Sequence, residues 1–159
     1  MLNELLSVLN ETETQQLMDA LPKIGLLIAG ADGEIDEKEI EWGAKLAYIR
    51  AYKAHGKHGA MDEVNEYFEK IDETYRSSFE NLMKTAPAET AERTAFLSTE
   101  LASLNDILDK LDPDFAHTMY QNFLSFAKHI ARAEGGVLGF ASINAAESKL
   151  IHLDMIHPR

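Results

Sequence analysis

Apolar residues recur every three or four positions through almost the whole chain, and this period limits the fold more than any other feature of the sequence. A period of this kind places apolar side chains on one face of an α-helix. No run alternates between apolar and polar residues for long enough to make a strand. The sequence therefore predicts an all-α fold, a bundle of about seven or eight helices.

Caps and helix breakers predict where these helices begin and end. Thr12 with Gln15 has capping-box spacing and predicts the start of the second helix. Pro22 predicts a kink or break within that helix. Two long amphipathic segments, on either side of Pro87, fill residues 61–111, and we expect them to form an antiparallel pair. Their regular apolar stripes predict core packing, with a homodimer interface as the alternative.

The last third of the chain predicts two further helices. Asp112 before Pro113 is a typical helix start, and the sequence Glu-Gly-Gly at 134–136 predicts its end. Asn144 with Glu147 again has capping-box spacing and predicts the start of a last helix. The apolar residues of this last helix are Leu150, Ile151 and Met155.

The charge of the chain narrows its choice of partners. Its formal net charge of −12 repels a phosphate backbone, so we expect no nucleic-acid partner and favour a basic partner or a metal cation. The absence of cysteine excludes disulfides and thiolate metal sites. The first ten residues contain no lysine or arginine, and no apolar run is as long as a membrane span. We therefore expect a cytoplasmic protein with no transmembrane segment.

The most acidic stretch of the sequence lies between two predicted helices. Positions 32–41 contain six carboxylates against one lysine. Gly33 can adopt the left-handed conformation that ends a helix, and Asp36 with Glu39 has the spacing of a capping box. Two interpretations are open: the acidic residues only cap helices, or some of them converge on a cation. The six acidic residues are Asp32, Glu34, Asp36, Glu37, Glu39 and Glu41.

The acidic stretch has a second, altered copy. Residues 28–35 (IAGADGEI) have a counterpart at residues 130–137 (IARAEGGV). Each copy reads as a helix, an acidic glycine turn, a cap and a second helix, and repeated units often pack face to face. We therefore expect one domain over residues 1–159, in which repeats at about 15–53 and 113–157 are joined by the long helical pair. We also expect the two acidic joints to lie close together.

The first joint has half of a calcium-binding motif. Asp32, Gly33 and Glu39 match the fifth, sixth and twelfth positions of an EF-hand loop, but Ile28 and Gly30 stand where the first two ligands should be. A complete EF-hand is therefore excluded. Hard divalent cations still prefer several oxygen ligands, which clustered carboxylates can supply. The candidate metal ligands are Asp32, Asp36 and Glu39 in the first copy and Glu134 and Glu147 in the second.

The first joint also resembles a known family. Residues 31–39, Ala-Asp-Gly-x-Ile-Asp-x-x-Glu, follow a predicted helix that ends Leu-Ile-Ala and resemble the signature of the TerB-like tellurite-resistance family. The sequence Ala-Arg-Ala-Glu-Gly at 131–135 is similar to the second half of that family. The resemblance covers residues 15–157, with a looser fit in the middle. Glu134 stands where the family has an aspartate, and an insertion shifts Glu147 relative to the turn.

The resemblance implies a pseudo-symmetric, TerB-like helical bundle and a link to tellurite resistance or stress response. It also implies an acidic site for a divalent metal ion, formed by the five candidate ligands, and protein partners within a stress-response system. The cofactor that the resemblance implies is a divalent metal ion, whose identity stays open.

No sequence motif selects a catalytic function. The chain has no Glu-x-x-His pair of a di-iron bundle, no His-Glu-x-x-His, no P-loop and no nucleophile elbow. We expect a non-enzymatic protein, with a metal-free helical interaction scaffold as the alternative and a metal-dependent hydrolase as a third hypothesis. His55 and His58 form a weak loop pair, interpreted as solvated, and His129 is interpreted as partly buried and hydrogen-bonded.

Overall fold

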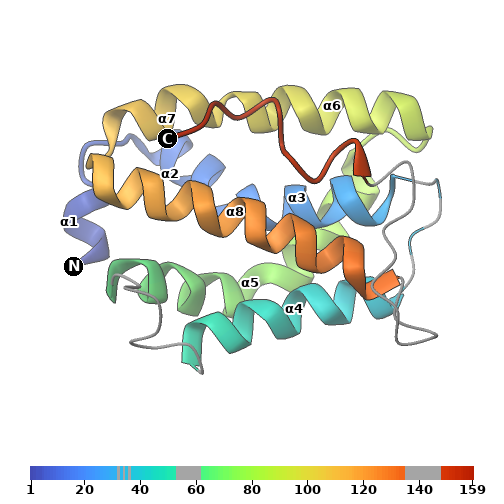
Figure 1. The fold of residues 1–159 in the computed structure, drawn as a ribbon, viewed down its shortest axis with the longest axis horizontal. Helices are drawn as coiled ribbons and strands as arrows, with labels where there is room; N and C mark the ends of the chain where they lie inside the picture. Colours follow the sequence, from blue (N-terminus) through green and yellow to red (C-terminus); the bar gives the residue numbers. More distant parts are fainter. Residues whose placement is uncertain (32, 34, 36, 53–61, 135–147) are drawn as a thin grey trace.

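The computed structural model describes residues 1–31, 33, 35, 37–52, 62–134 and 148–159. All regular structure in this part of the chain is α-helical, which confirms the all-α fold (Figure 1). Six of the described helices have eight or more residues, so the expected number of seven or eight was slightly high for helices of that length. The helices are α1 (Leu2–Leu6), α2 (Glu11–Met18), α3 (Ala20–Ala29), α4 (Glu37–Tyr52), α5 (Asp62–Thr85), α6 (Thr90–Ala102), α7 (Leu104–Lys110) and α8 (Pro113–Glu134).

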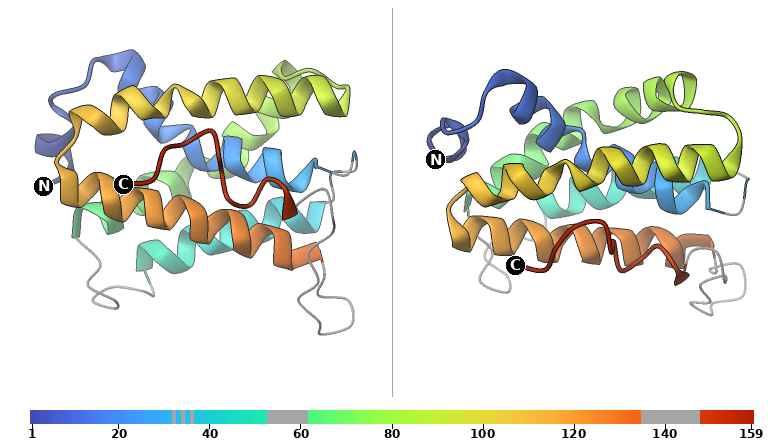
Figure 2. Two further views of the ribbon diagram at one scale, coloured as in Figure 1. Left: turned by 45° about the horizontal axis from the view of Figure 1, so that its top comes forward. Right: turned by 90° about the horizontal axis from the view of Figure 1, so that it is seen from above.

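Helix α3 is the centre of the bundle. All ten of its residues are buried, as expected for a helix that is apolar on nearly every face. It packs against α4, α5, α6 and α8, and the three views agree on this central position (Figures 1 and 2). A single hydrophobic cluster around α3 includes residues from every helix and from the C-terminal segment. None of the described helices is long and apolar enough to cross a membrane.

The two long segments on either side of Pro87 do not form the predicted antiparallel pair. Both α5 and α6 pack against α3, which lies between them, and the most extensive contacts of α5 are with α4. The reason is the composition of α3. Because it is apolar on nearly every face, it can cover the apolar stripes of both long helices at the same time.

The second helix begins earlier than the sequence predicted. Asn10 is its N-cap, and its side-chain oxygen accepts a hydrogen bond from the Glu13 N–H at 2.8 Å. The Asn10 N–H in turn donates to the Glu13 carboxylate at 3.2 Å, which completes a capping box. The predicted start at Thr12 with Gln15 was therefore wrong by two positions.

Two segments that were each predicted as one helix are divided. The predicted break near Pro22 occurs at Asp19, between α2 and α3, and Pro22 lies in the first turn of α3, where its missing N–H costs little. The segment after Pro87 breaks at Ser103, between α6 and α7. The predicted start at Asp112 is confirmed, because its carboxylate accepts a hydrogen bond from the Phe115 N–H at 3.1 Å.

Residues 149–159 form turns, so the predicted last helix does not continue through this segment. The side chain of Asn105 on α7 holds the segment instead. Its Nδ2 donates to the Met155 carbonyl, and its Oδ1 accepts from the His157 N–H, both at 2.8 Å. The buried Leu153 has a φ of 46°, a value incompatible with a helix. The C-terminal segment therefore runs as an irregular stretch of chain along α8, from beside α6 to beside α7 (Figure 1).

Candidate functional site

One of the five candidate metal ligands has a described side chain. Glu39 lies in the first turn of α4 and is buried, with 3% of its surface exposed. Glu134 is the last residue of α8, and its side chain lies outside the described part of the structure. Asp32, Asp36 and Glu147 also lie outside the described residues. Helix α4 begins at Glu37, directly after the predicted cap.

The helix ends that flank the two joints lie at the same end of the bundle. The ends of α3 and α8 and the start of α4 meet on the right-hand side of Figure 1. Helices α3 and α8 pack against each other, and α4 packs against both. The Trp42 indole N–H on α4 donates to the His129 carbonyl on α8 at 3.1 Å. A site shared by the two joints therefore stays open, because opposite ends of the bundle would have excluded it.

A glycine turn ends α3. The Gly30 carbonyl accepts the Gly33 N–H at 3.1 Å. Gly33 has a φ of 93°, in the region that favours glycine, as the sequence predicted. The same Gly30 carbonyl accepts a second hydrogen bond, from Nη2 of Arg93 on α6 at 2.8 Å. The turn is therefore held by its own backbone and by a side chain from a distant helix.

Arg93 joins the start of α6 to this turn. Its side chain is buried, with 7% exposed, and its Nη1 donates to the Ala88 carbonyl at 3.1 Å. A cation at the end of α3 is also favourable for the helix dipole. The Thr90 hydroxyl lies 3.2 Å from where a Cβ at Gly33 would stand. The N-terminus of α6 therefore borders the joint. The sequence did not predict this contact.

Glu89 caps the N-terminus of α6, which borders the joint. Its carboxylate accepts hydrogen bonds from the Glu92 N–H at 2.8 Å and the Ala91 N–H at 3.1 Å. These two bonds lower the pKa of Glu89, and the nearby positive charge of Arg93 adds to the effect. The carboxylate therefore stays ionised at neutral pH and stabilises the start of α6.

The described residues do not by themselves make a metal site. They contain no group of three or more histidine, aspartate or glutamate side chains that could hold a metal ion. Glu39 supplies one carboxylate, whereas a hard divalent cation needs several oxygen ligands. A complete site at the joint would therefore need further ligands from acidic residues outside the described side chains, and Asp32 and Asp36 are the candidates on the same joint. The chemistry of this donor set fits a hard cation, because it consists of carboxylates alone.

Polar side chains lie along the seam between α4 and α8. His129 is half-buried, and its Nδ1–H donates to the Ser125 carbonyl at 2.7 Å, which confirms the interpretation of a partly buried, hydrogen-bonded histidine. Arg50 donates to the Asn122 side chain at 2.9 Å and to the Ser125 hydroxyl at 2.7 Å. Burial lowers the pKa of Arg50 to about 10. His55 and His58 lie outside the described residues.

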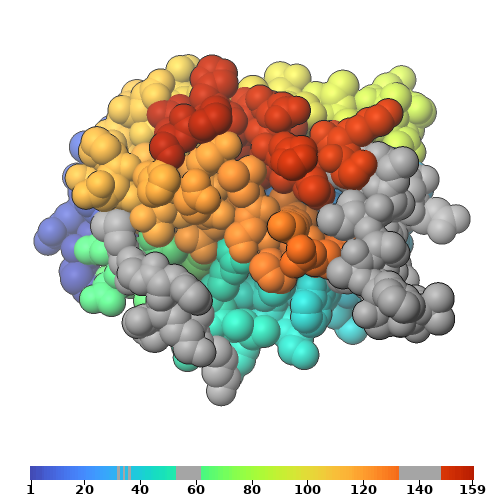
Figure 3. All heavy atoms as spheres, viewed as in Figure 1, coloured from blue at the N-terminus to red at the C-terminus, as the bar shows by residue number. Residues whose placement is uncertain are grey.

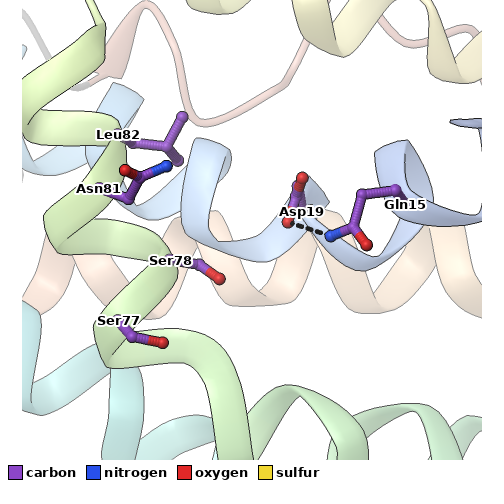
Figure 4. Close-up of a pocket in the computed structure, with 6 residues that line it drawn as sticks. All are labelled: Gln15, Asp19, Ser77, Ser78, Asn81 and Leu82. Carbon is purple, nitrogen blue, oxygen red and sulfur yellow. Dashed lines mark hydrogen bonds between the residues drawn. The ribbon is translucent and has the colours of Figure 1, made fainter.

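A separate polar hollow lies between α2 and α5 (Figure 4). Its volume is about 320 Å³, and it contains one carboxylate, Asp19, which accepts a hydrogen bond from the Gln15 side chain at 3.0 Å. One carboxylate is too few for a hard cation. None of the candidate metal ligands lines this hollow, so it does not belong to the joint. The lining residues are Gln15, Asp19, Ser77, Ser78, Asn81 and Leu82.

No family model, no curated protein and no solved structure matches the chain. The likeness of residues 31–39 to the TerB-like family therefore stays a resemblance between short motifs.

Proposed function

We propose that this chain is a non-enzymatic, TerB-like stress-response protein that binds a divalent cation at the joint between α3 and α4. The observation that supports this most is the burial of Glu39, which is 3% exposed at the start of α4. A buried carboxylate needs compensating positive charge or hydrogen bonds. The N-terminus of α4 is favourable for a negative charge at this position, and a cation at the joint would be favourable as well.

The proposed ligands are Asp32, Asp36 and Glu39, with Glu134 and Glu147 as further ligands from the second copy. A bound cation would neutralise the repulsion between carboxylates that the sequence crowds into ten positions. Gly33 and Arg93 shape the turn next to these ligands. The all-oxygen donor set favours calcium, magnesium or manganese over softer metals.

The alternative is a metal-free helical interaction scaffold with an acidic partner-binding surface. In this case Asp36 and Glu39 only cap α4, a role worth about 1 kcal/mol. The apolar side chains that stay exposed on α4, Tyr48 and Tyr52, favour this alternative. The two functions can occur in one molecule, because these tyrosines do not belong to the joint.

Isothermal titration calorimetry of the full chain with calcium, magnesium, manganese and zinc tests the cation site. We expect binding heat with at least one ion, and its loss in the double variant Asp32→Asn/Asp36→Asn. Asparagine still caps helices but is a poorer cation ligand than aspartate. The control Asp72→Asn/Glu73→Gln removes the same charge from α5 and should leave the heat unchanged. No heat with any ion, or an equal loss in both variants, would contradict the proposal.

The link to tellurite rests on the motif resemblance and needs its own test. We expect expression of the chain in a tellurite-sensitive bacterial host to improve growth on tellurite, and Asp32→Asn/Asp36→Asn to remove that gain. Equal growth with and without the chain would contradict a role in tellurite resistance. That result would leave the proposed cation site to be tested by calorimetry.

A further inference from the structure

Two exposed tyrosines lie one turn apart on the outer side of α4. Tyr48 is 44% exposed and Tyr52 is 48% exposed. Their ring centroids are 5.1 Å apart with an interplanar angle of 49°, so the rings contact each other. Helix α4 forms part of the surface below α8 in Figure 3. The pair therefore presents aromatic faces to solvent.

Two contacts show which part of α5 lies beside these tyrosines. A Cβ at Gly43 would stand 2.7 Å from Cζ of Tyr75, and the Arg50 guanidinium lies 5.4 Å from the centre of the Phe68 ring. Residues 43–50 of α4 therefore run antiparallel to residues 68–75 of α5. Tyr48 lies within this stretch. The acidic residues of the facing stretch are Glu69, Asp72 and Glu73.

These carboxylates act on Tyr52 through space. The pKa of Tyr52 is raised, first by desolvation and then by the negative charges of Asp72, Glu69 and Glu73. Glu73 is exposed, and the other two are partly exposed. The basic residues nearby on α5 are Lys70 and Arg76. Neither makes a salt bridge within the described part of the chain.

We propose that the aromatic–acidic face, formed by Tyr48, Tyr52, Asp72 and Glu73, binds an arginine-rich segment of a basic partner protein. A guanidinium group stacks on aromatic faces and forms paired hydrogen bonds to carboxylates, so it matches both halves of the face. The net charge of −12 attracts a basic segment over a longer range. This face identifies the binding surface of a scaffold, and it does not depend on a cation at the joint.

The test measures binding of the full chain to a fluorescein-labelled peptide in which arginine and serine alternate, by fluorescence anisotropy. We expect Tyr48→Ser/Tyr52→Ser to raise Kd by about ten-fold, because two stacking faces are lost. Tyr48→Phe/Tyr52→Phe keeps both rings and should bind as the unmodified chain does. Because both positions are exposed, circular dichroism should show an unchanged fold in each variant.

Matched charge changes separate this face from general attraction. Asp72→Asn/Glu73→Gln should also raise Kd, whereas Glu92→Gln/Glu100→Gln, which removes the same charge from α6, should change Kd little. An equal rise in both variants would show attraction by net charge alone and overturn the proposal. So would a peptide of lysine and serine that binds as tightly, since an ammonium group lacks the planar stacking of guanidinium.

Two further results would overturn the proposal. One is unchanged peptide affinity in the double serine variant. The other is a dimer in sedimentation velocity that this variant abolishes and the arginine peptide does not displace. The second result would assign the face to contact between two copies of the chain. Loss of peptide binding with intact cation binding, or the reverse, separates this proposal from the joint.

Discussion

The hydroxyl end of Tyr75 fills the space that a side chain at Gly43 would need. A Cβ at position 43 would stand 2.7 Å from Cζ and 2.8 Å from Cε1 of the Tyr75 ring. Gly25 on α3 leaves room for the same ring, because a Cβ at position 25 would stand 3.3 Å from Cζ of Tyr75. Tyr75 therefore wedges α5 against α3 and α4. This contact fixes the helix that begins at the joint and presents Tyr48.

Gly43→Ala should lower the free energy of unfolding by about 1–3 kcal/mol, because the new methyl group overpacks the core against Tyr75. This loss exceeds the gain of up to ~1 kcal/mol that alanine brings to a helix. Urea denaturation followed by circular dichroism measures the change. In a Tyr75→Leu background the same substitution should be neutral or stabilising, because the ring is gone. An equal loss in both backgrounds would contradict the wedge.

Removal of the two buried tyrosine hydroxyls of α5 should have different effects on the free energy of unfolding. Within the described residues the Tyr75 hydroxyl has no hydrogen-bond partner, whereas the Tyr67 hydroxyl donates to the Leu17 carbonyl at 2.7 Å. Tyr75→Phe should leave the free energy of unfolding unchanged or raise it by up to about 1 kcal/mol, since no bond is lost. Tyr67→Phe should lower it by about 1–2 kcal/mol. Thermal and urea unfolding of both variants measure these changes. Equal losses of unfolding free energy in the two variants would contradict the expected difference.

Arg93→Met should lower the free energy of unfolding by about 2–3 kcal/mol, because the buried Gly30 carbonyl loses one of its two donors and the Ala88 carbonyl loses its hydrogen bond from Arg93. The glycine turn should open more often, which hydrogen exchange at the Gly33 amide would detect. Arg93→Lys, with a single charged group, should recover only part of the loss. The exposed Arg132→Met is the control, with an expected change within about 0.5 kcal/mol. Similar exchange rates in all these variants would contradict the role of Arg93.

Glu89 and Glu13 should make the bundle sensitive to acid. Hydrogen bonds to backbone N–H groups lower the pKa of Glu89 in the folded state, and those to Lys110 and Asn10 lower that of Glu13. Below the ordinary value of 4.5 the unfolded chain therefore binds more protons at these positions than the folded chain does. Their contribution is present above that pH and is lost as the pH falls through the lowered folded-state pKa.

Urea denaturation at a series of pH values measures this effect. Glu89→Gln should lower the stability at neutral pH and flatten its fall in acid, since the variant has no carboxylate to protonate there. The exposed Glu92→Gln on the same helix is the control and should keep the slope of the unmodified chain. An unchanged acid slope in Glu89→Gln would show that this cap does not contribute.

Local signals predicted several helix boundaries correctly. Gly33 and Asp112 were identified because their roles depend on neighbouring residues. The start of α2 was missed because two capping boxes overlap in the sequence, and the one at Asn10 and Glu13 forms. The C-terminal segment was missed for a different reason. Asn105, some fifty positions earlier in the chain, determines its conformation, and no local pattern contains that information.

In the candidate site, too, the sequence predicted the local features and missed a contact between distant residues. The sequence alone located the acidic joint, and the structure adds the burial of Glu39. The sequence did not predict that Arg93 binds the Gly30 carbonyl, because the two residues are 63 positions apart in the chain. One signal was present: Arg93 lies four residues before Leu97, in line with the buried face of α6. An arginine within an apolar stripe indicates a buried partner, but it does not say which one.

The most direct test of the cation site is paramagnetic broadening by Mn²⁺, read residue by residue in an amide NMR spectrum of the isotope-labelled full chain. At less than one Mn²⁺ per chain, the signals of Gly30, Gly33 and Glu37 should broaden first, while those of Ser77 and Asn81 beside the polar hollow stay sharp. Asp32→Asn/Asp36→Asn should restore the broadened signals. Broadening spread evenly over the acidic surface, or centred away from the joint, would contradict the proposed cation site.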